Sequence, residues 1–152
     1  MHDVFRVLRT AGSALSTQRL RLNVIANNIA NVNTTRTADG GAYRRRQIVV
    51  EPKGRVFQLP LPSSFTAART YGPDDGLTGV EATRILIDDS PGPRVYEPGH
   101  PDADEEGYVE YPNVDVVTEM TDMISATRSY QANVTVIDSI KQLAMKALEI
   151  GR

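Results

Sequence analysis

The densest group of side chains able to do chemistry is the acidic run at residues 100–107, which reads His-Pro-Asp-Ala-Asp-Glu-Glu-Gly. With Asp102 as position one, Asp104 and Gly107 fall at positions three and six of a calcium-binding EF-hand loop. Position twelve is then Asn113, where such a loop needs a bidentate glutamate, and the prolines just upstream argue against a preceding helix. We therefore predict an acidic Asx-type turn between strands and no metal site; the alternative interpretation is a calcium-binding turn.

Catalytic constellations are missing from the sequence. His2 and His100 are the only imidazoles, and no glycine pattern of a nucleophile elbow accompanies a serine. The absence of cysteine removes thiolate nucleophiles, disulfides and cysteine metal sites. No HExxH pattern occurs, and the glycines have the wrong spacing for a phosphate-binding loop. We predict that the chain is not an enzyme, has no catalytic residue and uses no cofactor.

Charge is unevenly distributed along the chain. Residues 1–35 carry four arginines against one acidic residue, whereas residues 88–112 carry one arginine against eight acidic residues. The basic run Arg44-Arg45-Arg46 could contact phosphates, but it is short, the net charge is −2, and no recognition helix accompanies it. We expect this run to pair with the acidic block at 88–112 or with an acidic neighbour, and we predict no nucleic-acid partner.

Residues 4–32 are predicted to form one helix, because apolar residues recur in two rows at intervals of seven and no proline interrupts them. The two rows are offset by three and four residues, as in the seam of a coiled coil. Four asparagines then crowd the end of the segment and favour stopping the helix. The rows are Leu8, Leu15, Leu22 and Ile29, and Val4, Ala11, Gln18, Ile25 and Val32.

Residues 114–150 are predicted to form a second helix, capped at its start by Asn113 or Asp115. Ile124 and Ile140 lie outside its two rows, so the apolar stripe is wider than a two-stranded seam requires. The rows are Val116, Met123, Tyr130, Ile137 and Ala144, and Met120, Thr127, Val134, Lys141 and Leu148.

The middle of the chain is predicted to be a small β-rich module. Short strands are expected at 47–50, 80–87, 95–96 and 108–111, with a loop at 58–79 that is rich in Pro, Gly, Ser and Asp. The fold class is therefore α+β. Residues 1–35 and 112–152 would form a helical domain, an antiparallel coiled coil, and residues 36–111 a β-rich module inserted between the helices.

The two apolar stripes are longer than such a small module can cover. Contiguous exposed apolar surface marks an interface, so we predict assembly into an oligomer or filament. No apolar run reaches the ~18 residues of a membrane span. The predicted assembly residues are Leu8, Leu15, Leu22, Ile25, Asn28, Ile29, Asn31, Met120, Met123, Tyr130, Val134, Ile137 and Leu148.

One motif points to a known family. The run at 26–34, Ala-Asn-Asn-Ile-Ala-Asn-Val-Asn-Thr, resembles the N-terminal signature of the axial proteins of the bacterial flagellum, which rod and hook proteins share. The segments 35–45, 96–114, 119–133 and 147–152 resemble the proximal rod proteins within this family. The resemblance covers residues 4–57 and 79–152, most of the chain.

This resemblance implies a structural subunit of the basal-body rod, the drive shaft that motility requires. Its terminal helices would pack as an inner domain around a narrow export channel, with the β module outside. The implied partners are further copies of the chain, other proximal and distal rod proteins, basal-body ring and junction proteins, and the flagellar type III export apparatus. The implied location is the rod where it crosses the periplasm, reached without a cleaved signal peptide. The alternative is another axial rod subunit.

Overall fold

The computed structural model describes residues 2–38, 40–53 and 79–150. It confirms the α+β class, with long terminal helices and small antiparallel sheets between them. The predicted loop at 58–79 lies outside the described residues, apart from Gly79. The elements are α1 (His2–Ala30), β1 (Arg46–Pro52), β2 (Val80–Ile87), β3 (Arg94–Tyr96), β4 (Tyr108–Glu110) and α2 (Val116–Ile150).

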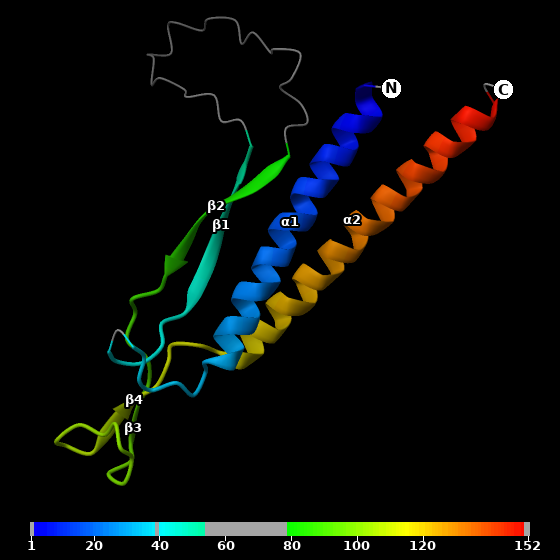
Figure 1. Ribbon diagram of the computed structural model, residues 1–152. Coiled ribbons are helices and arrows are strands. Elements are labelled where there is room, and N and C mark those ends of the chain that lie inside the picture. The colour runs from blue at the N-terminus through cyan, green and yellow to red at the C-terminus, as the bar shows by residue number, and fades with distance from the viewer. Residues whose placement is uncertain (1, 39, 54–78, 151–152) are drawn as a thin grey trace, which may run out of the picture.

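The two helices run in opposite directions, so that both ends of the chain lie at the same end of the molecule (Figure 1). They pack closest where α1 ends and α2 begins, and they diverge toward the chain ends (Figure 1). Ala11, Ile25 and Ala126 are buried, with exposed fractions of 5%, 5% and 1%. Ala126 belongs to the early part of α2, where a small side chain lets the two helices lie close together.

Each helix has a local reason to end where it does. α1 stops at Ala30, two residues earlier than predicted, and the amide of Asn31 donates to the carbonyls of Asn27 and Asn28 in the closing turn. α2 starts two residues later than predicted. Its N-cap is Asp115, whose carboxylate accepts from the amide of Val117 at 3.1 Å and from the Thr118 hydroxyl.

The strands form two separate hairpins. β1 pairs antiparallel with β2, from Arg46 opposite Ile87 to Pro52 opposite Val80, with a β-bulge in the register next to Val49. β3 pairs antiparallel with β4. The strand predictions are confirmed, with β1 longer at both ends than the predicted 47–50.

The β1–β2 hairpin lies along the side of α1 away from α2 (Figure 1). The amide of Val80 donates to the Ser13 hydroxyl of α1 at 3.1 Å. Gly79 has a φ of +84°, and a Cβ there would collide with Ser13. A glycine is therefore required where the hairpin meets α1.

Candidate assembly interface

A buried polar cluster joins α1, β1 and α2 at the point where the three elements meet. Its centre is Asn28, which is 1% exposed and uses all of its amide hydrogen-bonding capacity. Its Nδ2 donates to the carbonyl of Arg46 at 2.8 Å and to Glu119 at 3.0 Å. Its Oδ1 accepts from the amide of Arg46 and from the Tyr43 hydroxyl, both at 3.0 Å. Burial raises the pKa of Tyr43 above its usual 10.

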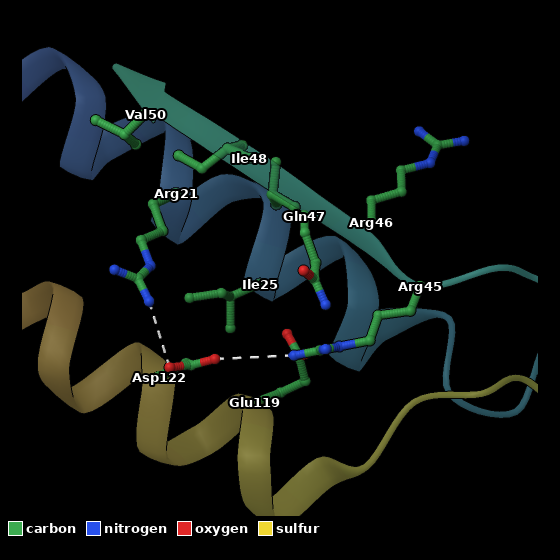
Figure 2. A pocket seen from close by; sticks show the side chains of 10 residues that line it. Arg21, Ile25, Arg45, Arg46, Gln47, Ile48, Val50, Glu119 and Asp122 are labelled. Atoms are coloured by element: carbon green, nitrogen blue, oxygen red, sulfur yellow. Dashed lines mark hydrogen bonds and ion pairs between the residues drawn. The ribbon is translucent and has the colours of Figure 1, made fainter. Parts of the chain in front are cut away.

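Glu119 brings the first turn of α2 into this cluster. Its side chain is 1% exposed, and its Oε1 accepts from Nε of Arg45 at 2.6 Å. Asp122, one turn later, approaches Arg21 at 3.4 Å and Arg45 at 3.8 Å, as Figure 2 shows. Asn113, the other candidate cap of α2, instead accepts from the amide of Arg45 at 2.8 Å.

A cavity of about 500 Å³ opens beside these ion pairs, between α1, β1 and the start of α2 (Figure 2). Val24 and Ile25 form an apolar part of its wall. The acidic side chains of Glu119 and Asp122, which also line it, contact arginines. These ion pairs hold α1, the residues at the start of β1 and the first turns of α2 together. The full lining is Arg21, Val24, Ile25, Arg45, Arg46, Gln47, Ile48, Val50, Glu119 and Asp122.

The three arginines at 44–46 each contact different partners. Arg44 pairs with Glu110 of the acidic block at 3.1 Å, which confirms the predicted pairing for this residue. Arg45 pairs with acidic residues of α2 instead, outside that block. The guanidinium of Arg46 lies over the Tyr43 ring, 5.5 Å from its centroid.

The acidic turn is stabilised by its own carboxylates, as predicted for an Asx-type turn. Oδ1 of Asp104 accepts from the amides of Glu106 and Tyr108, at 3.0 and 2.8 Å. Asp102 accepts from the Thr35 hydroxyl at 2.8 Å, and the amide of Asp102 donates to Nδ1 of His100. Within the described residues, no group of three or more His, Cys, Asp or Glu side chains could hold a metal ion.

Hydrogen bonds to these two carboxylates have an electrostatic consequence. The Thr35 hydroxyl holds the pKa of Asp102 below its ordinary value. The backbone amide of Tyr108 does the same for the pKa of Asp104, which also pairs with Arg94. Both carboxylates are therefore favoured in their charged form.

An apolar ridge remains exposed on the outer side of α2. Val117, Met120 and Ile124 follow one another at intervals of three and four residues, with exposed fractions of 73%, 55% and 55%. Farther along the same helix, Leu143 and Leu148 are 67% and 70% exposed. In the part of the chain that the structure describes, no helix is both long enough and apolar enough to cross a membrane.

The predicted assembly residues fall into three groups by burial. Ile25 and Asn28 are buried within the chain at the junction. Four α2 residues are exposed, namely Met120, Tyr130, Val134 and Leu148. The others are half-buried, namely Leu8, Leu15, Leu22, Ile29, Asn31, Met123 and Ile137.

Sequence reasoning did not single out Val117 as a surface residue or Glu119 and Arg45 as the ends of a buried ion pair. Val117 belongs to neither seven-residue row. The pattern that could have identified it is its spacing of three and seven residues from the apolar Met120 and Ile124. Glu119 looks like an ordinary acidic residue in the first turn of a helix. Only the position of residues 43–46 over that turn shows that it is buried.

Comparisons with known proteins agree along nearly the full length of the chain. Residues 8–36 match the family model "Flagella basal body rod protein", and residues 105–150 match "Flagellar basal body rod FlgEFG protein C-terminal". The chain is 42% identical to the flagellar basal-body rod protein FlgC of Bacillus subtilis over 152 residues, covering 97% of this chain and 98% of that one.

Other relatives carry the same name. The chain is 44% identical to FlgC of Borreliella burgdorferi, over 97% of each chain, and 39% identical to FlgC of Salmonella typhimurium, over 98% of each chain. Identity at this level over whole chains shows common family membership. The chain therefore belongs to the FlgC family of flagellar basal-body rod proteins, which are structural subunits of the rod and not enzymes.

Proposed function

We propose that the chain is a subunit of the proximal rod that assembles helically through its terminal helices around the export channel and so contributes to motility. The observation that supports this is the apolar ridge at Val117, Met120 and Ile124, which stays exposed while Glu119 and Ala126 of the same helix are buried. A ridge of this kind on a folded subunit is typical of a surface that another protein covers.

The ridge lies on a different side of α2 from the junction with β1. At 3.6 residues per turn, Met120 and Ile124 are rotated by roughly 100° and 140° around α2 from Glu119, which faces the junction. A neighbour bound at the ridge therefore lies on a different side of the subunit from β1. An interface between two different surfaces of identical subunits continues head to tail and builds a helical tube when it does not close into a ring.

The terminal helices would form a coiled-coil inner domain in the assembled rod. The half-buried residues of the predicted set then serve the contact between α1 and α2. The exposed ones, Met120, Tyr130, Val134 and Leu148, then contact neighbouring subunits. The helices diverge toward the chain ends (Figure 1), and Leu143 and Leu148 are exposed in that part of α2.

The proposed partners are further copies of this chain, other proximal and distal rod proteins, and basal-body ring and junction proteins. The subunit would pass through the flagellar type III export apparatus without a cleaved signal peptide and lie where the rod crosses the periplasm. Among axial proteins the proximal position is favoured, because the relatives compared above are all named FlgC. The metal-binding alternative has no support in the acidic turn, where Asp102 and Asp104 bind protein groups instead.

The test is complementation of a motile bacterium that lacks its own FlgC. Met120→Asp and Ile124→Asp place a charge on the ridge and should abolish swimming and the recovery of the subunit in purified basal bodies. Ser125→Asp is the matched control, because it adds the same charge to an exposed position of the same helix off the ridge. Both ridge variants should keep the circular dichroism of the parent. Normal swimming with either ridge variant would rule out the ridge as an assembly surface.

A further inference from the structure

The seven-residue rows of α1 and α2 select one alignment of the helices only in part. Leu8, Leu15 and Leu22 repeat at intervals of seven on α1, and α2 has apolar residues at the same interval. Sliding α2 by seven residues places one apolar side chain where another stood along the row Val116, Met123, Tyr130 and Ile137, whereas Thr127 and Lys141 interrupt the second row. A slipped alignment therefore keeps the first row in contact, but it puts polar residues into the second row and replaces the buried Ala126 by Glu119 or Asn133.

The polar junction does not repeat in this way. Glu119 is the member of the cluster that α2 contributes, and it binds both Asn28 and Arg45. Seven residues before it stands Pro112, and seven residues after it stands Ala126. Neither side chain can accept a hydrogen bond. A one-heptad slip would therefore leave the buried amide of Asn28 with one donor unpaired and remove the partner of Arg45, both of which are unfavourable.

The ion pairs of Asp122 contribute less to selecting the alignment of α2 against α1. Its contacts with Arg21 and Arg45 are long, at 3.4 and 3.8 Å, and its side chain is 36% exposed. Partly exposed pairs of this kind contribute little free energy. Among the side chains of α2 itself, Glu119 therefore distinguishes the native alignment most strongly from a slipped one, and Asn113 just before the helix adds its hydrogen bond with the amide of Arg45.

We infer that Glu119, with Arg45 and Asn28, is a register lock that selects one alignment of α2 against α1 and β1. A buried polar group that fixes the register of packed helices is an established physical device. In this chain the alignment of α2 also determines where its exposed side chains lie relative to β1. A slip of seven residues would carry the outer face of α2 about 10 Å along the helix axis relative to β1.

The test measures the alignment directly in the full-length chain. Because the chain has no cysteine, Arg19→Cys and Lys146→Cys give unique sites for two spin labels, both at exposed positions of α1 and α2. The two sites are well separated along the helix axis, so a slip changes their distance by nearly its full length. Double electron–electron resonance should give one distance for the chain with the lock intact.

Glu119→Leu combined with Arg45→Met removes the lock while filling its space with apolar side chains. We expect this chain to stay helical and to show a second distance displaced by about 10 Å. Glu119→Gln leaves one acceptor oxygen for the two donors, Asn28 Nδ2 and Arg45 Nε, so it breaks half of the lock and should show a smaller fraction of the second distance than the double variant. Ile25→Ala is the matched control, because it weakens buried apolar packing and leaves the lock intact.

Several results would overturn the inference. A single distance in the double variant of Glu119 and Arg45 would mean that the apolar contacts select the register. Loss of its helical signal would mean that these residues supply stability and not selection. A second distance in Ile25→Ala, or a larger fraction of it in Glu119→Gln than in the double variant, would also contradict the inference. The measurement needs no assembled rod, so its outcome is separate from the fate of the proposed function.

Discussion

Glu119 in the first turn of α2 accepts a hydrogen bond from Nε of Arg45 at 2.6 Å, and its side chain is almost completely removed from solvent. The two residues lie 74 positions apart in the sequence. A buried carboxylate is stable only when its charge is compensated, so this pair forces the segment before β1 to fold over the start of α2. The β hairpins and the helix pair are thereby joined at a defined place.

Removing Arg45 should therefore have a large effect on stability. Arg45→Ala leaves Glu119 buried with only the hydrogen bond from Asn28, and breaking such a pair destabilises by about 3–5 kcal/mol. Urea unfolding followed by circular dichroism measures the loss. Arg21→Ala is the comparison, because its ion pair with Asp122 is more than a third exposed on both sides and should contribute about 0–1 kcal/mol. Equal losses in the two variants would mean that burial of the Arg45–Glu119 pair adds nothing to its effect on stability.

Much of the fold follows from local sequence patterns. The seven-residue rows predicted both helices, and the β-branched runs predicted the positions of all four described strands. The acidic turn was predicted because Asp at the start of a turn bonds the amide two residues on, as Asp104 does with Glu106. These features depend on residues that are close together along the chain.

The junction could not be predicted in the same way. The burial of Glu119 depends on Arg45 and Asn28, which approach it from distant parts of the sequence. The end of α1 was placed two residues too late for a related reason, since Val32 continues the apolar row while the asparagine-rich turn has already closed. Periodicity indicates which face of a helix is apolar, but not which element covers that face.

The connection between β2 and β3 should tolerate no side chain at residue 92. A Cβ on Gly92 would collide with the backbone carbonyl oxygen of Tyr111, a group that cannot move aside without disturbing the hairpin. Gly92→Ala should destabilise the chain by about 1–3 kcal/mol, as overpacking does elsewhere. Gly99→Ala is the control, because a Cβ at Gly99 meets nothing within 4 Å, and its unfolding midpoint in urea should match the parent. A neutral Gly92→Ala would show that the two segments are farther apart.

Stability should fall at acidic pH. Asp102 and Asp104 have pKa values below the ordinary value in the folded chain, because they accept hydrogen bonds from Thr35 and from the amide of Tyr108. Groups of this kind stabilise the fold above their unfolded pKa of about 3.9, and the contribution is lost as the pH falls through the lower folded pKa. The urea midpoint should therefore drop below about pH 4.

The responsible carboxylates can be identified by NMR titration of their side-chain carbons. Asp102→Asn and Asp104→Asn together should reduce the pH dependence of the urea midpoint, and Asp88 and Asp115, whose pKa values are also lowered, should account for the remainder. Glu105→Gln removes a neighbouring exposed acid of the same turn and controls for the loss of charge alone. A titration of Asp102 at or above its unfolded pKa would be incompatible with the hydrogen bond from Thr35.

Removing the side-chain amide of Asn28 should lower the stability more than removing the Tyr43 hydroxyl that it binds. Asn28→Ala leaves the Tyr43 hydroxyl and the amide of Arg46 without their acceptor, and each buried unpaired group costs about 1–3 kcal/mol. Tyr43→Phe removes one donor while Asn28 keeps the amide of Arg46, so its cost should be about 1 kcal/mol. Urea unfolding of the two single variants and of the double variant forms a complete cycle. Because both changes act on one hydrogen bond, the double variant should lose less than the sum of the single losses. Strict additivity would mean that the Tyr43 hydroxyl does not bind Asn28 in solution.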